Sequence, residues 1–209
     1  MEKEIPYYKQ LDNTHCFQAC LKMILKYFFP EKDFTFEELD KISDKQKDKW
    51  SWSCAALVEL KRMGLKVRHY STFDYSAFIR NGADYIRKIY EKDVAEKMIE
   101  MSDINSEIEN ANDMLRENIF ELRELSFEDV EKQFKEGYAI TLLINSRIIN
   151  SETGYSGHFV VLTGFDESNV FINDPAIKHG SENRKLNKNL FIRAWTFPKK
   201  ENDIILIKR

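Results

Sequence analysis

Two residues near the start of the chain have the types and spacing needed for nucleophilic chemistry with a thiol. In the stretch QLDNTHCFQACLKMIL, Cys16 opens a run with helical periodicity, and Gln10 lies six residues before it. The unpaired N–H groups and the positive dipole end of a helix N-terminus stabilise a thiolate, so this position suits a nucleophilic cysteine. Acyl transfer through a thiolate develops an oxyanion, which the Gln10 side-chain amide and the Cys16 backbone N–H could stabilise together.

A thiol nucleophile also needs a base and a group that orients the base, and the C-terminal part of the chain offers both. His158 begins the strand-like run HFVVLTGF after a glycine-containing loop, and Asp174 follows sixteen residues later in INDPA. A short turn at 166–169 would pair the two strands antiparallel and bring His158 and Asp174 to the same end of the hairpin. Two simpler interpretations stay open, namely a structural strand histidine and an Asp-Pro turn.

The other cysteines fit this chemistry less well. Cys20 lies one helical turn after Cys16 on the packed face, and Cys54, at another helix start, is expected in the core; we therefore prefer Cys16 as the nucleophile. Three cysteines are too few for a disulfide framework, so free thiols in a reducing compartment are expected. His15, Cys16 and Cys20 lack the second ligand pair that structural zinc requires, and we predict neither a metal nor a cofactor.

The elements that must position these residues follow an α+β pattern, with helices towards the N-terminus and antiparallel strands towards the C-terminus. One domain is expected over 1–209. Capping boxes and apolar periodicity predict helices over 16–28, from Thr35 onwards, over 53–63, and from Ser126 to Gly137. Alternation and apolar runs predict the strands LKVRHYS, YAITLLIN, HFVVLTGF, NVFIND and the final DIILIKR.

Residues 75–122 differ in character from the rest of the chain. They are rich in charge and almost free of Gly and Pro, and they hold neither a strand pattern nor a catalytic cluster. We expect two or three amphipathic helices here, an insertion whose charges form a solvated face. Because this segment links the nucleophile half to the base half, we expect it to pack beside the cleft and limit substrate entry, with a dimerisation surface as the alternative. The positions expected to face the core are Phe78, Ile86, Ile89 and Tyr90.

The overall charge excludes several classes of partner. The 209 residues carry a net charge of only −3 with both signs interspersed, so we expect neither a nucleic-acid partner nor an acidic membrane surface. No apolar run approaches the roughly 18 residues that span a bilayer. The N-terminus MEKEIPYYKQ lacks the basic and apolar regions of a secretory signal, so a cytoplasmic location is expected.

The motifs together resemble a known family. QLDNTHCFQACLKMILKYF and GHFVVLTGFDESNVFINDPA are similar to the bacteriocin-processing, double-glycine leader peptidases, the thirty-ninth family of cysteine peptidases, which are papain-like. The resemblance implies a papain-like fold and a peptide or protein substrate. It also implies Cys16 as nucleophile, His158 as base, Asp174 as the orienting acid and Gln10 as oxyanion donor. The matching helical run is Ala19, Leu21, Met23, Leu25 and Tyr27.

Two departures from the family pattern leave the function open between three alternatives. The family usually has Gly after the nucleophile, where this chain has Phe17, which would crowd the cleft, and the stretch 75–122 has no counterpart in the compact family core. The chain contains no transporter domains, so we do not expect a leader peptidase coupled to export. The alternatives are a peptide or isopeptide hydrolase, an acyltransferase with the same intermediate, and a catalytically silent peptide-binding domain. Trp50 and Trp52 could line a substrate groove or pack against the insertion.

Overall fold

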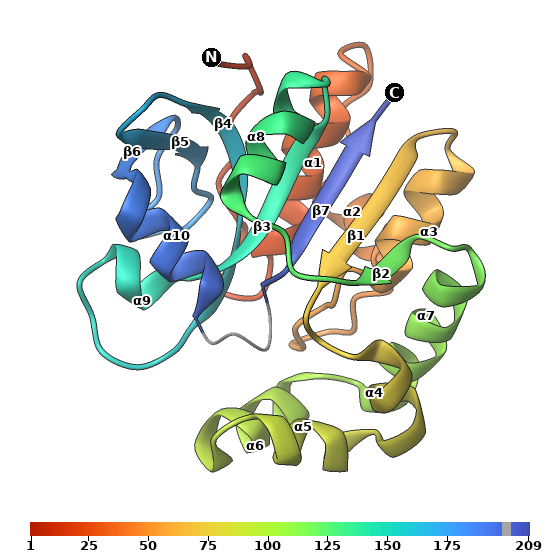
Figure 1. Ribbon diagram of the computed structural model, residues 1–209. Helices are drawn as coiled ribbons and strands as arrows, with labels where there is room; N and C mark the ends of the chain where they lie inside the picture. The colour runs from red at the N-terminus through yellow and green to blue at the C-terminus, as the bar shows by residue number, and fades with distance from the viewer. Residues whose placement is uncertain (198–201) are drawn as a thin grey trace.

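The computed structural model describes residues 1–197 and 202–209, whose elements are arranged around a seven-stranded sheet (Figure 1). The strand order is β2-β1-β7-β3-β4-β5-β6; β1 and β2 pair in parallel, and all other neighbours are antiparallel. The strands are β1 (Lys66–Ser71), β2 (Phe120–Leu122), β3 (Ala139–Asn145), β4 (Gly157–Phe165), β5 (Asn169–Asn173), β6 (Arg184–Asn187) and β7 (Ile204–Lys208). The helices are α1 (Cys16–Phe28), α2 (Phe36–Ile42), α3 (Cys54–Arg62), α4 (Tyr75–Asn81), α5 (Ala83–Ile89), α6 (Lys92–Met101), α7 (Ile104–Arg116), α8 (Phe127–Lys135), α9 (Ser146–Ile149) and α10 (Lys188–Thr196).

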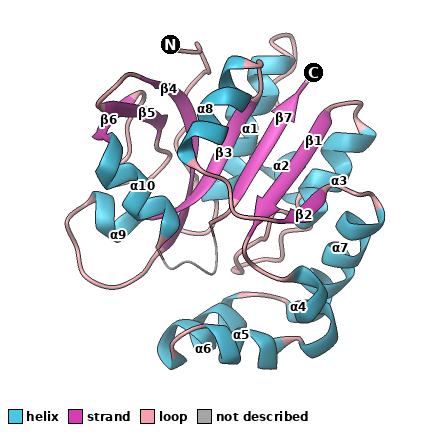
Figure 2. Ribbon diagram, in the orientation of Figure 1, coloured by secondary structure: helices cyan, strands magenta, loops and turns pink. Residues whose placement is uncertain are grey.

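Helices cover both faces of the sheet, as Figure 2 shows: α1, α2 and α3 lie on one side, and α8 and α10 lie on the other. Alternate residues of β7 enter the two cores. Ile205 and Ile207 belong to the core with α1 and α3, while Ile204 and Leu206 belong to the core with α8 and α10. A strand buried on both faces needs apolar residues throughout, which explains the unbroken run IILI.

The hairpin of β4 and β5 forms as its sequence predicts. The Asp166 backbone N–H donates to the Asn169 carbonyl at 2.9 Å, and the strands then pair antiparallel, with Val161 opposite Asn173. The two strands therefore bring the start of β4 close to the end of β5, where the predicted base and its acid lie.

Local capping explains where two of the helices begin. Thr35 and Glu38 form a reciprocal capping box at α2, and Ser126 and Asp129 form another at α8. In each box the side chain of the cap residue accepts from the backbone N–H three residues later, and the acidic side chain accepts from the backbone N–H of the cap residue. Two N–H groups that would otherwise lack a partner are thereby satisfied. The helix predicted over 16–28 is confirmed as α1.

The segment 75–122 is more divided than its sequence predicts. It contains the four helices α4 to α7 where two or three were expected, and it also contains the short strand β2, where no strand was expected. A strand of three residues is too short to show a period, and it forms because β1 offers it an edge. The predicted inward positions are confirmed, since Phe78, Ile86 and Tyr90 are buried and Ile89 packs against the same core.

The sheet also differs from the predicted antiparallel C-terminal sheet. It is mixed, because β2 pairs in parallel with β1, and the last strand, β7, lies between β1 and β3 rather than at an edge. Which strands become neighbours in a sheet depends on contacts between residues far apart in sequence, and no local pattern predicts these contacts. Within 1–197 and 202–209, no helix has both the length and the apolar character required to cross a membrane.

Candidate active site

Cys16 is the first residue of α1 and is half-buried there. The residue before it, His15, is the N-cap, and its ring Nδ1 lies 2.7 Å from Asp12 Oδ1 while Nε2 lies 3.3 Å from Asp40 Oδ1. His15 is thereby tied to two carboxylates and anchors the helix start. The first turn of α1 holds no acidic residue, so nothing in that turn offsets the positive end of the helix dipole at the thiol.

His158 and Asp174 lie close together, as the hairpin predicted. The ring Nε2 of His158 is 2.8 Å from Asp174 Oδ1, and the two residues are only 7% and 1% exposed. His158 also makes a hydrogen bond with the Cys16 thiol. Because Nε2 faces the carboxylate, Nδ1 is the ring nitrogen left for the sulfur. The structure therefore brings Cys16, His158 and Asp174 into one continuous chain of hydrogen bonds.

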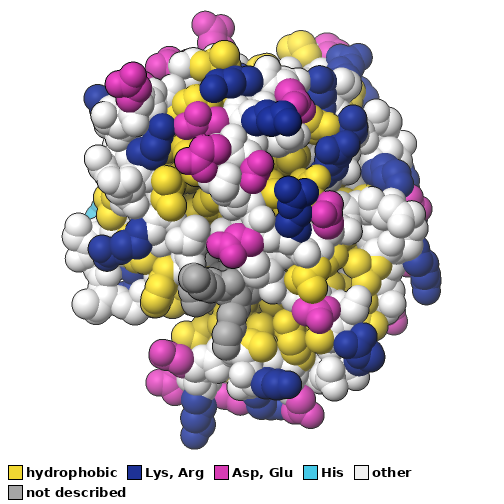
Figure 3. Space-filling view, viewed as in Figure 1, with side chains coloured by type: hydrophobic (Ala, Val, Ile, Leu, Met, Phe, Trp, Pro, Cys, Tyr) yellow, Lys and Arg dark blue, Asp and Glu magenta, His cyan; other side chains and the backbone are white. Residues whose placement is uncertain are grey.

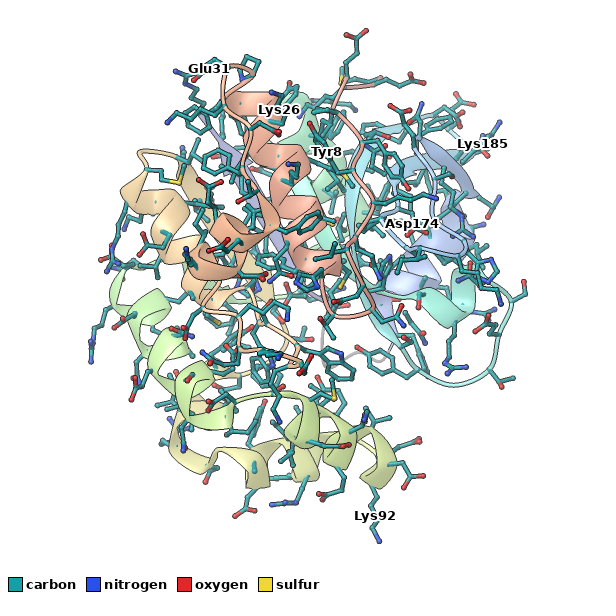
Figure 4. The ribbon with its side chains drawn as sticks, turned by 180° about the vertical axis from the view of Figure 1, so that it is seen from behind. Tyr8, Lys26, Glu31, Lys92, Asp174 and Lys185 are labelled. Carbon is teal, nitrogen blue, oxygen red and sulfur yellow. The ribbon has the colours of Figure 1, made fainter. Side chains whose placement is uncertain are left out.

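Asp174 is itself held by groups that the sequence did not indicate. Its Oδ1 also accepts from the Ala176 backbone N–H at 3.0 Å, and its Oδ2 accepts from Arg184 Nη1 at 2.8 Å. Arg184 Nη2 in turn donates to Asn150 Oδ1 at 2.8 Å and to the Ile149 carbonyl at 3.1 Å. Figure 4 shows Asp174 inside the molecule, beside the N-terminal segment. Arg184 thus fixes the carboxylate in place.

The three groups shift one another's pKa towards a charged pair. Burial alone would raise the pKa of the Cys16 thiol, but the hydrogen bond and charge of His158 lower it below its ordinary value. Burial would likewise lower the pKa of His158, yet the bonds to Asp174 and Cys16 raise it to about 9. For Asp174, burial opposes ionisation, but the His158 bond leads the interactions that lower its pKa to about 2. These directions favour a thiolate–imidazolium pair at neutral pH.

Gln10 lies in the N-terminal segment, next to the end of the hairpin. Its backbone N–H donates to the Pro175 carbonyl at 3.0 Å, and the nearby Tyr7 hydroxyl donates to the Asp174 carbonyl at 3.0 Å. The Gln10 Oε1 atom is buried, and its side chain makes no hydrogen bond with the described residues. An amide without a structural partner keeps its N–H donors free for a ligand.

The remaining cysteines have the opposite electrostatic setting. Both Cys20 and Cys54 are fully buried, and burial is the main reason why the pKa of each thiol is raised well above its ordinary value. The charge of Cys16 raises the pKa of Cys20 further, and that of Glu107 does so for Cys54. Neither thiol is suited to act as a nucleophile.

A cavity of about 430 Å³ opens beside Cys16. Its aromatic lining comprises Phe17, Trp50, Trp52, Phe73, Tyr75, Tyr90, Tyr155 and Phe159. Helix α6 contributes Asp93, Val94, Lys97 and Met98 to the same cavity, so the prediction that segment 75–122 lies beside the cleft is confirmed. Figure 3 shows hydrophobic side chains along the boundary between the sheet and the α5–α6 pair.

The cavity lining answers two questions that the sequence left open, the role of Trp52 and the effect of Phe17. Trp52 both lines the cavity and packs against segment 75–122, where its ring stacks on Phe78 with centroids 4.8 Å apart and its Nε1 donates to Ser102 Oγ at 3.0 Å. Phe17 is buried against the Phe159 ring, with centroids 4.9 Å apart, and forms part of the wall. The expected crowding by Phe17 therefore leaves a cavity at the thiol.

The sequence profile of the Peptidase_C39 like family matches residues 2–201. The chain belongs to this family. It is therefore a papain-like cysteine peptidase by family, in agreement with the resemblance of its motifs. No curated protein matches the chain in sequence.

Solved structures of C39 peptidase domains share the fold. A double glycine motif protease from an AMS/PCAT transporter, solved in complex with the leader peptide, is 16% identical with a TM-score of 0.52, covering 99% of this chain and 93% of its own. The peptidase domain of Streptococcus ComA, a bifunctional ABC transporter involved in quorum sensing, is 14% identical with a TM-score of 0.53, and 98% of each chain is covered. A C39-like peptidase from Bacillus anthracis is 16% identical with a TM-score of 0.53, covering 99% and 95%.

Proposed function

We propose that this chain hydrolyses peptide bonds with Cys16 as nucleophile, His158 as acid and base, and Asp174 as the group that orients His158. The observation that carries the proposal is the unbroken series of hydrogen bonds from the thiol to the carboxylate, at a helix N-terminus beside a cavity. A charged pair that is already formed gives a potent nucleophile and a proton donor at the same site.

The chemistry follows from these positions. The Cys16 thiolate attacks the carbonyl carbon of the substrate, and the oxyanion that forms accepts hydrogen bonds from the Cys16 backbone N–H and the Gln10 side-chain amide. The intermediate collapses, the C–N bond breaks, and the imidazolium of His158 gives its proton to the departing amine. An acyl thioester remains on Cys16. His158 then takes a proton from water, which attacks the thioester and releases the carboxylic acid and the thiolate.

The substrate in this proposal is a peptide or protein segment that fits the cavity beside Cys16. The relative solved with a leader peptide supports a peptide as the bound partner. Helix α6 lines the cavity, and Figure 4 shows Lys92 at the start of that helix pointing away from the molecule. We therefore propose that α6 presents its inner residues to the substrate and limits what enters, while its outer face meets solvent.

Thiol labelling tests the nucleophile directly. Treating the full chain with iodoacetamide or an epoxide probe at pH 6–7, and mapping the adducts by mass spectrometry, is expected to modify Cys16 far faster than Cys20 or Cys54. The reason is that a His158-paired thiolate forms at this pH, whereas the other two thiols stay protonated and buried. Equal labelling of all three cysteines, or preferential labelling of Cys20, would contradict the assignment.

An acyltransferase would form the same thioester and differ only in the acceptor. Adding a competing amine to a reaction with a cleaved peptide separates the two: hydrolysis gives a free carboxylate as the main product, and transfer gives the amide. A catalytically silent domain would yield neither product, and its Cys16 would not acquire an acyl group.

A further inference from the structure

The cavity beside Cys16 contains a second carboxylate that the proposed chemistry does not use. Asp203 lines this cavity just before β7, and the residue is only 6% exposed. Its Oδ1 lies 2.8 Å from Nε2 of His69, and among the described residues no group donates to its Oδ2. Since Oδ2 has no partner among the described residues and yet is not one of their buried unpaired atoms, it is open to the cavity, where a ligand donor can reach it.

The position of Asp203 is fixed from several sides. Its backbone carbonyl accepts from the Leu143 backbone N–H at 3.2 Å and from Trp195 Nε1 at 3.1 Å. His69 is fully buried, and its other ring nitrogen lies 3.3 Å from the Met114 sulfur. The carboxylate is therefore preorganised and needs no rearrangement to meet a ligand.

The surroundings of Asp203 favour a positive charge. Within the described part of the chain its carboxylate lies against the His69 ring, and no lysine or arginine there pairs with it. Lys97, the cation on the cavity lining, pairs with Glu100 at 2.9 Å, and its side chain is 52% exposed. The cavity lining is also rich in aromatic rings, and the face of an aromatic ring attracts a cation.

We infer that this cavity binds a lysine or arginine side chain of the peptide substrate close to the scissile bond, with the cationic end on Asp203 and the aliphatic stem along Trp52 and Tyr75. The inference rests on the proposed peptidase activity of Cys16 and adds its selectivity. A long basic side chain suits a cavity with apolar walls and one interior carboxylate, because its stem is apolar and its charge is terminal. A substrate with only glycine at these positions would leave the cavity and the carboxylate unfilled.

A set of matched covalent probes tests the inference. N-acetylated peptidyl acyloxymethyl ketones carry lysine, norleucine or Nε-acetyl-lysine at each of the three residues before the reactive ketone in turn, and the rate of Cys16 labelling is followed by mass spectrometry. Acetylation of the N-terminus removes the α-amine as an alternative cation. At one position, lysine is expected to label on the order of 10-fold faster or more than norleucine and acetyl-lysine, because only lysine can pair with Asp203.

In the variant Asp203→Asn, the lysine probe should label Cys16 no more than about threefold faster than the norleucine probe, because the charge that pairs with lysine is removed. Asp113→Asn, which removes one exposed carboxylate from α7 outside the cavity, should leave the lysine preference unchanged. If no probe labels Cys16, the proposed peptidase function fails. If probes label Cys16 but lysine shows no advantage at any position, or Asp203→Asn keeps the advantage, only the inference is overturned. The wild-type comparison of lysine with acetyl-lysine stands even if Asp203→Asn does not fold.

Discussion

Two cysteines of this chain begin helices, and each lies close to a buried histidine–aspartate pair whose ring nitrogen and carboxylate oxygen are 2.8 Å apart. Cys16 begins α1 and is hydrogen-bonded to the imidazole of His158. Cys54 begins α3 and is hydrogen-bonded to the hydroxyl of Tyr75 instead. The two sites share a helix N-terminus and a nearby histidine–aspartate pair, and they differ in what contacts the sulfur.

The difference shows which feature activates a thiol. Burial and the charge of Glu107 raise the pKa of Cys54 well above its ordinary value, although it stands at a helix N-terminus. At Cys16, burial is the largest single influence, but the hydrogen bond and charge of His158, together with backbone hydrogen bonds from Phe159 and Phe17, outweigh it and lower the pKa. A helix N-terminus alone therefore does not make a thiolate in this protein, and direct contact with an imidazole does.

Replacing Asp174, the acid that orients His158 at the Cys16 site, should have the largest effect on activity. Asp174→Asn should lower kcat, since the equivalent change in a serine triad costs about 10⁴-fold, with a smaller loss here because papain-like enzymes can use Asn in this role. Asp174→Ala should lose more activity than Asn. It should also raise the pKa of Cys16, because His158 would bind its proton less tightly. Steady-state kinetics and the pH dependence of Cys16 alkylation measure both effects.

Circular dichroism of both Asp174 variants is the control for folding. If the Asn and Ala variants both turn over substrate normally, Asp174 is only a turn residue and does not orient His158.

Replacing Arg184, which donates to the Asp174 carboxylate, should have a smaller effect on activity. Arg184→Met removes the donor to Asp174 Oδ2, and misplacement of the base by a fraction of an ångström should lower kcat about 10- to 100-fold. Arg184→Lys should recover part of the activity, because one ammonium can reach the carboxylate but cannot also bridge to Asn150. A shift in the pH profile of Cys16 alkylation separates positioning from simple destabilisation. Full activity of Arg184→Met would show that Asp174 needs no such support.

The smallest expected effect concerns Glu107, whose charge raises the pKa of Cys54. Burial raises the pKa of Glu107 to about 8, against the bond it accepts from the Trp52 backbone N–H at 3.0 Å. The folded state therefore holds a proton that the unfolded chain releases near its ordinary value of 4.5. The stability due to this proton is complete below that value and is lost as pH rises through about 8.

Glu107→Gln keeps the acceptor for Trp52 and removes the titration. Thermal unfolding at pH 5, 7 and 9 should show the melting temperature of the variant rising relative to wild type as pH increases. Asp113→Asn, on the exposed face of the same helix, is the matched control and should show no such trend. A difference between Glu107→Gln and wild type that stays constant with pH would mean that Glu107 is ionised throughout the range.

The elements that depend on neighbouring residues could be predicted from the sequence. The capping boxes at Thr35 and Ser126, the helix that begins at Cys16, and the hairpin that joins His158 to Asp174 all depend on groups within about twenty positions of one another. Caps, periodicity and turn residues record such contacts directly, because they are made by the same short stretch that displays the pattern. The hairpin brings His158 and Asp174 together, whereas the contact of Cys16 with His158 also needs α1 to pack against β4.

The surroundings of those residues depend on long-range packing. Arg184 reaches Asp174 from β6, Asp203 enters the cavity from the start of β7, and α6 closes one wall from the middle of the chain. β2 forms only because β1 provides an edge, and β7 is central although it ends the chain. These placements depend on which surfaces bury together, and a contact between residues far apart in sequence leaves no periodic trace in either partner. The thiol chemistry could thus be predicted from local patterns, whereas the shape and charge of the cavity had to come from the packing.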